Sequence, residues 1–493
     1  MTQRRRFVLL CVITLLGSAL RLYQIGTQSL WFDELLSVTI SKLNLATVIT
    51  SPASIDPPLY YILLHLWLGL GHDDSIVRLL SALPEILAIP AMYVLGRKMF
   101  NVQVALVATS IFAVAPLQIF YSQEARMYAF LILFSILSIW AYVRAVESNQ
   151  KRDWALWVLA SVLSLYTHTI AVLLLFVFDL DALTHWRISK RPIQPVVASN
   201  ITIGLFLMPS FILLLQKLSW LLPALWLQRP TILQPLITFY VFMFSYSLPF
   251  PANMIALFIM LSALAFLSLA VWRALQRRGS RERANLSLLS LTLLLPPMIL
   301  FLISQWRSVY IDRLLLGSSP ALYLLLAWGI VQSDRRYVLR ICAVVAFPFV
   351  LFSLLNYYTQ PEYAKTPLRQ AIQYVETHRT PGELVVHTSD SSFLAGRYYD
   401  AHGNHVLLYN PSDQWLTPVL MNDLEVPFGK DALQIISGQE RYWVVVALDH
   451  IPDEQLAEKS VLGNAGILLG ETQIGGIGVY HYSMKTLQGS TYK

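Results

Sequence analysis

Charged residues are scarce in this chain, and their scarcity indicates its class. Lys, Arg, Asp and Glu make up 13% of its 493 residues, whereas hydrophobic residues make up 56%. A soluble domain carries about a quarter charged residues, because its surface faces water. Long apolar runs with few charges are instead typical of helices that cross a membrane. The composition therefore predicts a polytopic α-helical membrane protein.

Cysteine is nearly absent as well. The only two cysteines, Cys11 and Cys342, both lie within apolar runs. Two such residues cannot build a disulfide framework or a cluster of thiolate metal ligands. The chain also lacks a basic stripe that could follow a nucleic-acid backbone, because its net charge of +7 is dispersed in short clusters. These absences exclude a disulfide-built domain and argue against nucleic acid as a partner.

The basic clusters predict how the chain crosses the membrane, because cytoplasmic loops are enriched in Lys and Arg. Arg4, Arg5 and Arg6 precede an apolar run about one span long, which we interpret as an uncleaved first helix with a cytoplasmic N-terminus. An even number of crossings must separate neighbouring clusters, which predicts about 11 spans. The other clusters are Arg97/Lys98, Lys151/Arg152, Arg187/Lys190/Arg191, Arg273 through Arg283, and Arg335/Arg336/Arg340.

Three apolar segments need this counting rule, since length alone leaves them undecided. Residues 56–70 are too short to span, so we predict an interfacial helix inside one long outer loop, residues 24–75. The segment 231–250 is predicted not to cross. Residues 154–184 are predicted to form two short spans that turn at "YTHT", near His168.

From residue 357 onward the pattern changes. Acidic residues outnumber basic ones there by 15 to 9, whereas the preceding part has 27 basic and 14 acidic residues. Short β-rich runs such as "GELVVHTS" and "RYWVVVALD" alternate with helical or loop stretches. We therefore predict a transmembrane domain, residues 1–356, followed by a small extracytoplasmic α/β domain, residues 357–493.

Polar residues gather at the turns that this topology places on the outer face. Ionisable residues are costly in a membrane, so a set of them on one face indicates a functional site. One or two could cap helices or reach for water, but four separate outer turns contribute here. The set comprises Asp33, Glu34, Asp56, Glu124, Arg126, His168, Arg307, Asp312 and Arg313.

This inventory suits sugar transfer from a lipid-linked phosphate. A carboxylate can deprotonate an acceptor hydroxyl, and Arg side chains can hold a phosphate as it leaves. Donors of this kind are the activated sugars available away from cytosolic nucleotides. Nearby aromatic residues can face a sugar ring or a lipid; they are Trp31, Phe32, Tyr60, Tyr61 and Tyr128.

A series of motifs carries a family resemblance. The chain contains, in order, "LWFDELLSV", "DPPLYYILLHLW", "VRLLSALPEI…GRKMF", "PLQIFYSQEARMYAF" and "YTHT". These resemble the membrane glycosyltransferases of the GT-C fold, above all family 39, which includes protein O-mannosyltransferases and aminoarabinose transferases. The resemblance covers about residues 20–185 and reaches more weakly to "DRLLLGSSPALYLLLAWG". One departure is Asp56, where relatives often have His before the paired prolines.

The resemblance implies an inverting transferase that uses a polyprenyl-phosphate sugar, with Asp33 as the catalytic base and Glu34 beside it. The sugar (hexose, mannose or pentose) stays open, and so does the acceptor, which can be a lipid, a glycan or a protein. No modules of the kind that accompany eukaryotic protein mannosyltransferases are present, so a protein acceptor is not implied. The expected location is the plasma (inner) membrane, with the active site and the C-terminal domain extracytoplasmic.

We predict that the donor phosphate and the substrate are bound by Glu124, Arg126, Tyr128, His168 and Arg313. Each has a simpler alternative: Glu124 and Arg126 could form a turn ion pair, and His168 could be a satisfied turn histidine. Tyr128 could belong to the interfacial aromatic belt, and Arg313 could extend towards water.

Other acids and bases of the outer face have structural alternatives too. Asp33 and Glu34 could cap an interfacial helix, and we predict this role for Asp56. Arg307 could either extend its side chain to water at the membrane surface or bind a phosphate. A divalent cation stays open as a cofactor, since Asp33, Glu34, Glu124 and His168 could supply ligands.

Two other functions stay open. A transporter or lipid flippase could use the same acids and arginines as a path, but it predicts inverted repeats and broken spans near the midplane, and no repeat is apparent. The other hypothesis is a non-catalytic protein, in which the outer α/β domain binds a glycan or a partner.

Overall fold

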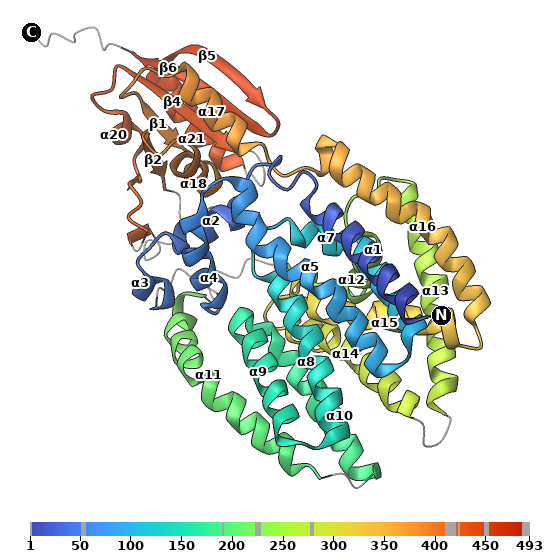
Figure 1. Ribbon diagram of the computed structural model, residues 1–493. Helices are drawn as coiled ribbons and strands as arrows, with labels where there is room; N and C mark the ends of the chain where they lie inside the picture. The colour runs from blue at the N-terminus through green and yellow to red at the C-terminus, as the bar shows by residue number, and fades with distance from the viewer. Residues whose placement is uncertain are drawn as a thin grey trace, which may run out of the picture. The chain divides into compact units, whose positions relative to one another are not determined.

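The computed structural model describes residues 2–50, 56–189, 192–221, 228–276, 281–409, 421–422, 424–447 and 453–485 (Figure 1). The chain forms two compact units. The first, which we call the membrane unit, comprises Met1–Ile25, Ile55–Tyr60 and Val77–Tyr363. The second, the sheet unit, comprises Gly26–Ser54, Tyr61–Ile76 and Ala364–Lys493. Most of the predicted first outer loop thus groups with C-terminal residues, while the predicted domain boundary between residues 356 and 357 stays a prediction.

Long apolar helices build the membrane unit. Within the described ranges, eight helical segments are long and apolar enough to cross a membrane, or nine if the bent pair α6–α7 is one span. These helices confirm the predicted polytopic helical membrane protein. Their bounds are α5 Asp74–Met99, α6 Val102–Val114, α7 Pro116–Ser122, α8 Tyr128–Ser148, α10 Val172–Ser189, α11 Gln194–Leu221, α13 Ala252–Leu275, α14 Arg281–Ile303, α15 Ser319–Gln332 and α16 Arg336–Thr359.

Two further helices fall just outside this count. Helix α1, Gln3–Leu22, is 20 residues long but carries several arginines, and α9, Lys151–Thr167, has 17 residues. The predicted total of about 11 spans stays a prediction.

Short helices lie where the sequence predicts segments that do not cross. Helix α4, Leu59–Trp67, continues into the 3₁₀ turn η1, Leu68–Leu70, and α12, Gln234–Phe244, has 11 residues. Helices α9 and α10 are separated at His168 by the 3₁₀ turn η2, Thr169–Ala171. A longer 3₁₀ segment, η3 (Asp312–Ser318), precedes α15.

A buried ion pair joins three helices of the membrane unit. The Arg21 Nη2 atom of α1 lies 3.4 Å from Glu85 Oε1 of α5, and both side chains are fully buried. Arg21 Nη1 also donates to the carbonyl oxygens of Gly17, at 3.0 Å, and Ala113 of α6, at 2.9 Å. Gly17 allows this close packing, because a Cβ there would meet Ile89 Cδ1 at 2.6 Å. The pair therefore fixes α1 against α5 and α6.

A six-stranded mixed sheet forms the centre of the sheet unit and confirms the predicted small α/β fold. The strand order is β3-β2-β1-β4-β6-β5; β1 pairs in parallel with β2 and β4, and β6 runs antiparallel to β4 and β5. The strands are β1 Leu384–His387, β2 Asn404–Leu408, β3 Phe428–Gly429, β4 Arg441–Ala447, β5 Gly466–Ile474 and β6 Ile477–Met484. The helices of the unit are α2 Phe32–Ser41, α3 Leu45–Thr50, α17 Leu368–His378, α18 Asp390–Tyr399, α20 Ala432–Ile436 and α21 Asp453–Ala465.

Polar contacts tie the N-terminal segments of the sheet unit to its C-terminal helices. Ser29 Oγ donates to Gln370 Oε1 at 2.8 Å, and Arg369 Nη1 lies 3.0 Å from Asp74 Oδ2. The Tyr399 hydroxyl donates to the same Asp74 oxygen at 2.8 Å. Segments far apart in the sequence therefore share one polar network.

Replacing Arg21 with Met should destabilise the protein by about 3–5 kcal/mol, because it leaves the carboxylate of Glu85 buried without its counter-charge. Thermal unfolding of the purified protein in detergent measures the loss. The double variant Arg21→Met/Glu85→Leu should regain part of the stability, since no buried charge remains. A double variant as unstable as the sum of the two single variants would contradict this role.

Candidate functional site

Asp56 lies at the centre of a buried polar cluster in the membrane unit. Its Oδ2 atom is 3.1 Å from Arg126 Nη2, and its Oδ1 atom is 3.5 Å from His168 Nε2. The carboxylate therefore joins three segments: the entry to α4, the turn between α7 and α8, and the break between α9 and α10. The sequence suggested a capping role for Asp56; α4 begins only at Leu59, and the carboxylate contacts these two side chains.

The tight turn between α7 and α8 positions Arg126. The amide of Arg126 donates to the carbonyl of Glu124 at 2.7 Å, and Ser81 Oγ of α5 donates to the carbonyl of Arg126 at 2.9 Å. The guanidinium lies over the ring of Tyr128, 6.0 Å from its centroid. Backbone and side chain of Arg126 are thus both held, which favours a fixed direction for its charge.

His168 lies at the opposite side of the same carboxylate. It ends α9, stacks on Tyr128 with ring centroids 6.2 Å apart, and accepts a hydrogen bond at Nδ1 from the amide of Ile170 at 3.2 Å. Because Nδ1 accepts, the neutral ring carries its proton on Nε2, the atom that faces Asp56. Burial lowers the pKa of His168, the Asp56 charge raises it, and the charges of Arg126 and Arg313 lower it further.

Arg313 brings a second positive charge to this cluster. It lies half-buried in η3, and its charge acts both on His168 and on Tyr246. The Tyr246 hydroxyl lies 3.4 Å from that of Tyr121, and burial raises the pKa of Tyr246, with a further rise from the charge of Asp312. The charges of two arginines from distant turns therefore both act on one histidine.

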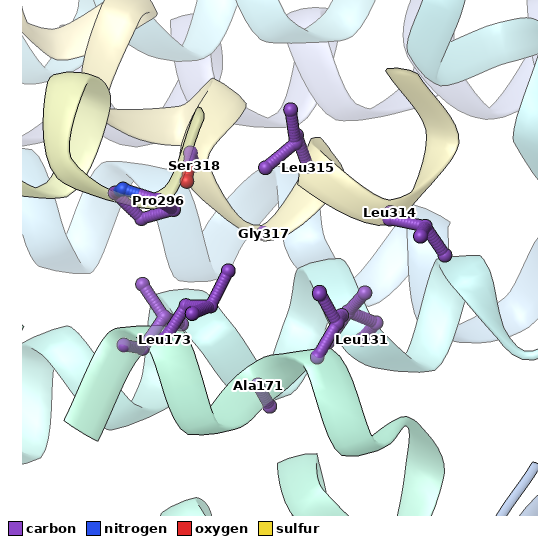
Figure 2. Close-up of a pocket in the computed structure, with 10 residues that line it drawn as sticks. Leu131, Ala171, Leu173, Pro296, Leu314, Leu315, Gly317 and Ser318 are labelled. Atoms are coloured by element: carbon purple, nitrogen blue, oxygen red, sulfur yellow. The ribbon is translucent and has the colours of Figure 1, made fainter. Parts of the chain in front are cut away.

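A small apolar hollow is lined in part by residues that are close to His168 and Arg313 in the sequence. Figure 2 shows it between η2 with the start of α10 on one side and η3 with α14 on the other. Leu314 directly follows Arg313, and Ile170 lies two residues after His168. Its lining residues are Leu131, Ile170, Ala171, Leu173, Leu174, Pro296, Leu314, Leu315, Gly317 and Ser318. The polar cluster and an apolar surface thus lie on the same short segments.

The structure brings most of the predicted binding residues together. Arg126, Tyr128 and His168 contact one another or Asp56, and the charge of Arg313 acts on His168. Glu124 is buried in the same turn, and its charge acts on Tyr246. Arg307 is exposed, and Asp312 accepts a hydrogen bond from Thr238 Oγ1 at 2.5 Å. The functional role of these residues stays a prediction.

The predicted acids Asp33 and Glu34 belong to the sheet unit, in the first turn of α2. Glu34 is fully buried; its Oε2 atom accepts from the amide of Trp31 at 3.2 Å and pairs with Lys365 Nζ at 2.9 Å. Asp33 is only partly buried. The two adjacent acids therefore have different surroundings, and their catalytic assignment stays a prediction.

Sequence reasoning missed two partners of these residues. Lys365 carried no motif, and Tyr246 lies in a segment that was interpreted only for its topology. The Asp56 contacts had one available signal, since Asp56 stands where similar proteins often have His. Within the described parts of the chain, no group of three or more His, Cys, Asp or Glu residues could hold a metal ion.

Comparison with solved structures decides the fold. The apo structure of ArnT from Cupriavidus metallidurans matches with a TM-score of 0.63 at 14% identity, over 96% of this chain and 97% of that one. The chain has the GT-C fold. The complex of ArnT with undecaprenyl phosphate gives a TM-score of 0.62 at 13% identity, over 97% and 98% of the two chains. The apo oligosaccharyltransferase of Archaeoglobus fulgidus gives 0.54 at 12% identity, over 99% and 75%.

Sequence comparison supports the same resemblance over a smaller part of this GT-C chain. Residues 56–213 match the family model of dolichyl-phosphate-mannose-protein mannosyltransferases. The match begins at Asp56 and includes Arg126 and His168, while Asp33 and Arg313 lie outside it. No curated protein sequence matches the chain. The predicted resemblance to GT-C glycosyltransferases is confirmed.

Replacing Asp56 with Asn should lower the pKa of His168, because the carboxylate is the group that raises it while burial and the two arginines act in the other direction. NMR titration of the imidazole, assigned with a His168→Gln variant, measures the shift. Asp73→Asn, an exposed acid of the sheet unit, is the matched control and should leave it unchanged. An unchanged or raised pKa in Asp56→Asn would show that the pair does not govern His168.

Proposed function

We propose that this GT-C protein is a glycosyltransferase of the plasma (inner) membrane. It moves a hexosyl, mannosyl or pentosyl group from a polyprenyl-phosphate donor to an acceptor that is a lipid, a glycan or a protein. The N-terminus is cytoplasmic, and the active site and the C-terminal domain are extracytoplasmic. The reaction inverts the anomeric centre, since one displacement by the acceptor oxygen leads directly to product.

The observation that carries this proposal is the buried cluster of Asp56, Arg126 and His168, on which the charge of Arg313 also acts. A polyprenyl phosphate suits such a site in a membrane protein, because its phosphate is anionic and its chain is apolar. A guanidinium has five N–H donors, so Arg126 can keep its contact with Asp56 and still bind a phosphate oxygen. The solved complex of ArnT with undecaprenyl phosphate, a protein of the same fold, supports a ligand of this class.

In this mechanism Asp33 removes the proton from an acceptor hydroxyl. The acceptor oxygen then forms its bond to the anomeric carbon, while the bond from that carbon to the phosphate oxygen breaks. The phosphate leaves with the bonding electron pair, and Arg126 and Arg313 stabilise the charge that develops on it. His168 stays beside Asp56, and Glu124, Tyr128 and His168 shape the site around the donor.

Of the two adjacent acids, Asp33 suits the base better than Glu34. A base must be accessible to the acceptor, and Asp33 is only partly buried, whereas Glu34 is fully buried and paired with Lys365. The contacts of Glu34 with the Trp31 amide and with Lys365 fix the first turn of α2, from which Asp33 also extends. Glu34 therefore serves the catalytic pair by holding this turn.

Asp33→Asn should lower sugar transfer by about 100- to 10,000-fold, because the amide cannot accept the proton. The assay supplies radiolabelled polyprenyl-phosphate sugars to membranes and follows the label into lipid, glycan and protein fractions. Asp73→Asn, an exposed acid of the same predicted outer loop, should keep full transfer. No Asp33-dependent transfer with any of several donor sugars would instead favour a transporter or flippase.

Arg313→Ala should lower kcat/KM for the lipid-linked donor about 100-fold, because the departing phosphate loses one stabilising charge. Initial rates over a range of donor concentrations measure the change. Arg307→Ala removes an exposed arginine six residues earlier and should leave donor use intact. Equal losses in both variants would count against a phosphate contact by Arg313.

A further inference from the structure

A second hollow of the membrane unit, of about 360 Å³, lies among the ends of α5, α8 and α14. It shares no residue with the candidate site. Its walls combine cationic and aromatic side chains, and nothing in the proposed transfer reaction uses them. The lining residues are Tyr93, Val94, Arg97, Lys98, Phe100, Trp140 and Arg281.

The hollow lies at the opposite helix ends from the Asp56 cluster. Helix α8 begins at Tyr128, which stacks on His168, and ends at Ser148, next to Glu147. A helix rises 1.5 Å per residue, so the 21 residues of α8 span roughly 30 Å, the thickness of the hydrocarbon core. The hollow therefore faces the other leaflet, where the basic clusters predict the cytoplasm.

The polar wall of the hollow carries an excess of positive charge. Lys98 Nζ and Arg281 Nη2 both pair with the carboxylate of Glu147, each at 2.5 Å. One carboxylate thus serves two cations. Arg97 is exposed, and within the described parts of the chain it makes no hydrogen bond or ion pair with its side chain. An anion in the hollow would meet uncompensated charge.

An apolar wall adjoins the cations on the side of the membrane centre. Tyr93 and Val94 precede Arg97 and Lys98 by four residues in α5, so each pair shares a helix face with one turn between its members. Trp140 of α8 likewise lies about two turns before Glu147. Val94 is 47% exposed, although it is apolar. Charge lies at the helix ends, and apolar surface lies one turn deeper.

We propose that this hollow binds the headgroup of an anionic phospholipid in the leaflet opposite the candidate site. The cations hold the lipid phosphate, and the aromatic and aliphatic wall receives the first part of its acyl chains. A free phosphate ion carries no apolar part and would leave the exposed apolar surface of Val94 without a partner. Lys and Arg side chains that only extend to water at the membrane surface would not require a hollow between the helices.

Titration of the purified full-length protein in detergent with phosphatidylglycerol or phosphatidylcholine, read by native mass spectrometry, tests this site. The wild type should bind phosphatidylglycerol in preference to phosphatidylcholine. Arg97→Gln should weaken phosphatidylglycerol binding about fivefold, the effect of one cation near a membrane surface. Arg187→Gln, an exposed arginine of another basic cluster, is the matched control and should bind like the wild type.

A second variant separates a lipid from a soluble anion. Val94→Ser keeps every charge but removes apolar surface, so it should weaken phosphatidylglycerol binding, and inorganic phosphate should not compete. Both substituted side chains are exposed, and unchanged thermal unfolding would verify that the variants fold. Competition by inorganic phosphate with no effect of Val94→Ser would overturn the proposal in favour of a soluble anion. Equal weakening in Arg97→Gln and Arg187→Gln would overturn it in favour of non-specific attraction.

Discussion

The contact between Asp56 and Arg126 is the interaction on which the candidate site depends. A charge inside a helical membrane protein must be paired, because the low dielectric makes an isolated ion costly. Asp56 supplies that partner for Arg126 and at the same time faces His168, so one carboxylate sets the positions of three turns. Arg21 and Glu85 likewise neutralise each other's charge inside the unit, but both side chains are fully buried and the pair joins helices only. The side chains of Asp56 and Arg126 are each 10% exposed, whereas those of Arg21 and Glu85 are fully buried.

Neighbouring residues within a motif also have different surroundings in the structure. In "DE" of the first predicted loop, one acid is buried against Lys365 and the other stays partly accessible. In the next motif, the amide of Arg126 donates a hydrogen bond to the carbonyl of Glu124. The guanidinium of Arg126 contacts Asp56 and the ring of Tyr128. A charge that is held in this way needs little reorganisation to act on a bound group, which is the property that the proposed role in phosphate stabilisation requires.

Local patterns predicted the helices well, and long-range pairings lay beyond them. Apolar runs predicted the long helices, a short apolar run the helix at Leu59, and "YTHT" the break at His168. The alternation of β-rich and helical runs likewise predicted the α/β fold of the C-terminal part. By contrast, Asp56 and Arg126 are 70 residues apart, and Glu34 and Lys365 are 331 apart. Pairings of that kind leave no periodic trace in one sequence, so their roles emerge only from the folded chain.

The grouping of Gly26–Ser54 and Tyr61–Ile76 with the C-terminal residues has a consequence for biogenesis. These segments leave the ribosome early, whereas Lys365, Arg369 and Tyr399, which hold Glu34, Asp74 and Leu30, are made 295 to 369 residues after those partners. Contacts between residues so far apart in the sequence form slowly, because the chain loses the entropy of the closed loop before the contacts can stabilise it. The first helices can therefore enter the bilayer early in synthesis, while α2 and its buried acid Glu34 reach their final surroundings only after the segment that carries Lys365 has been made.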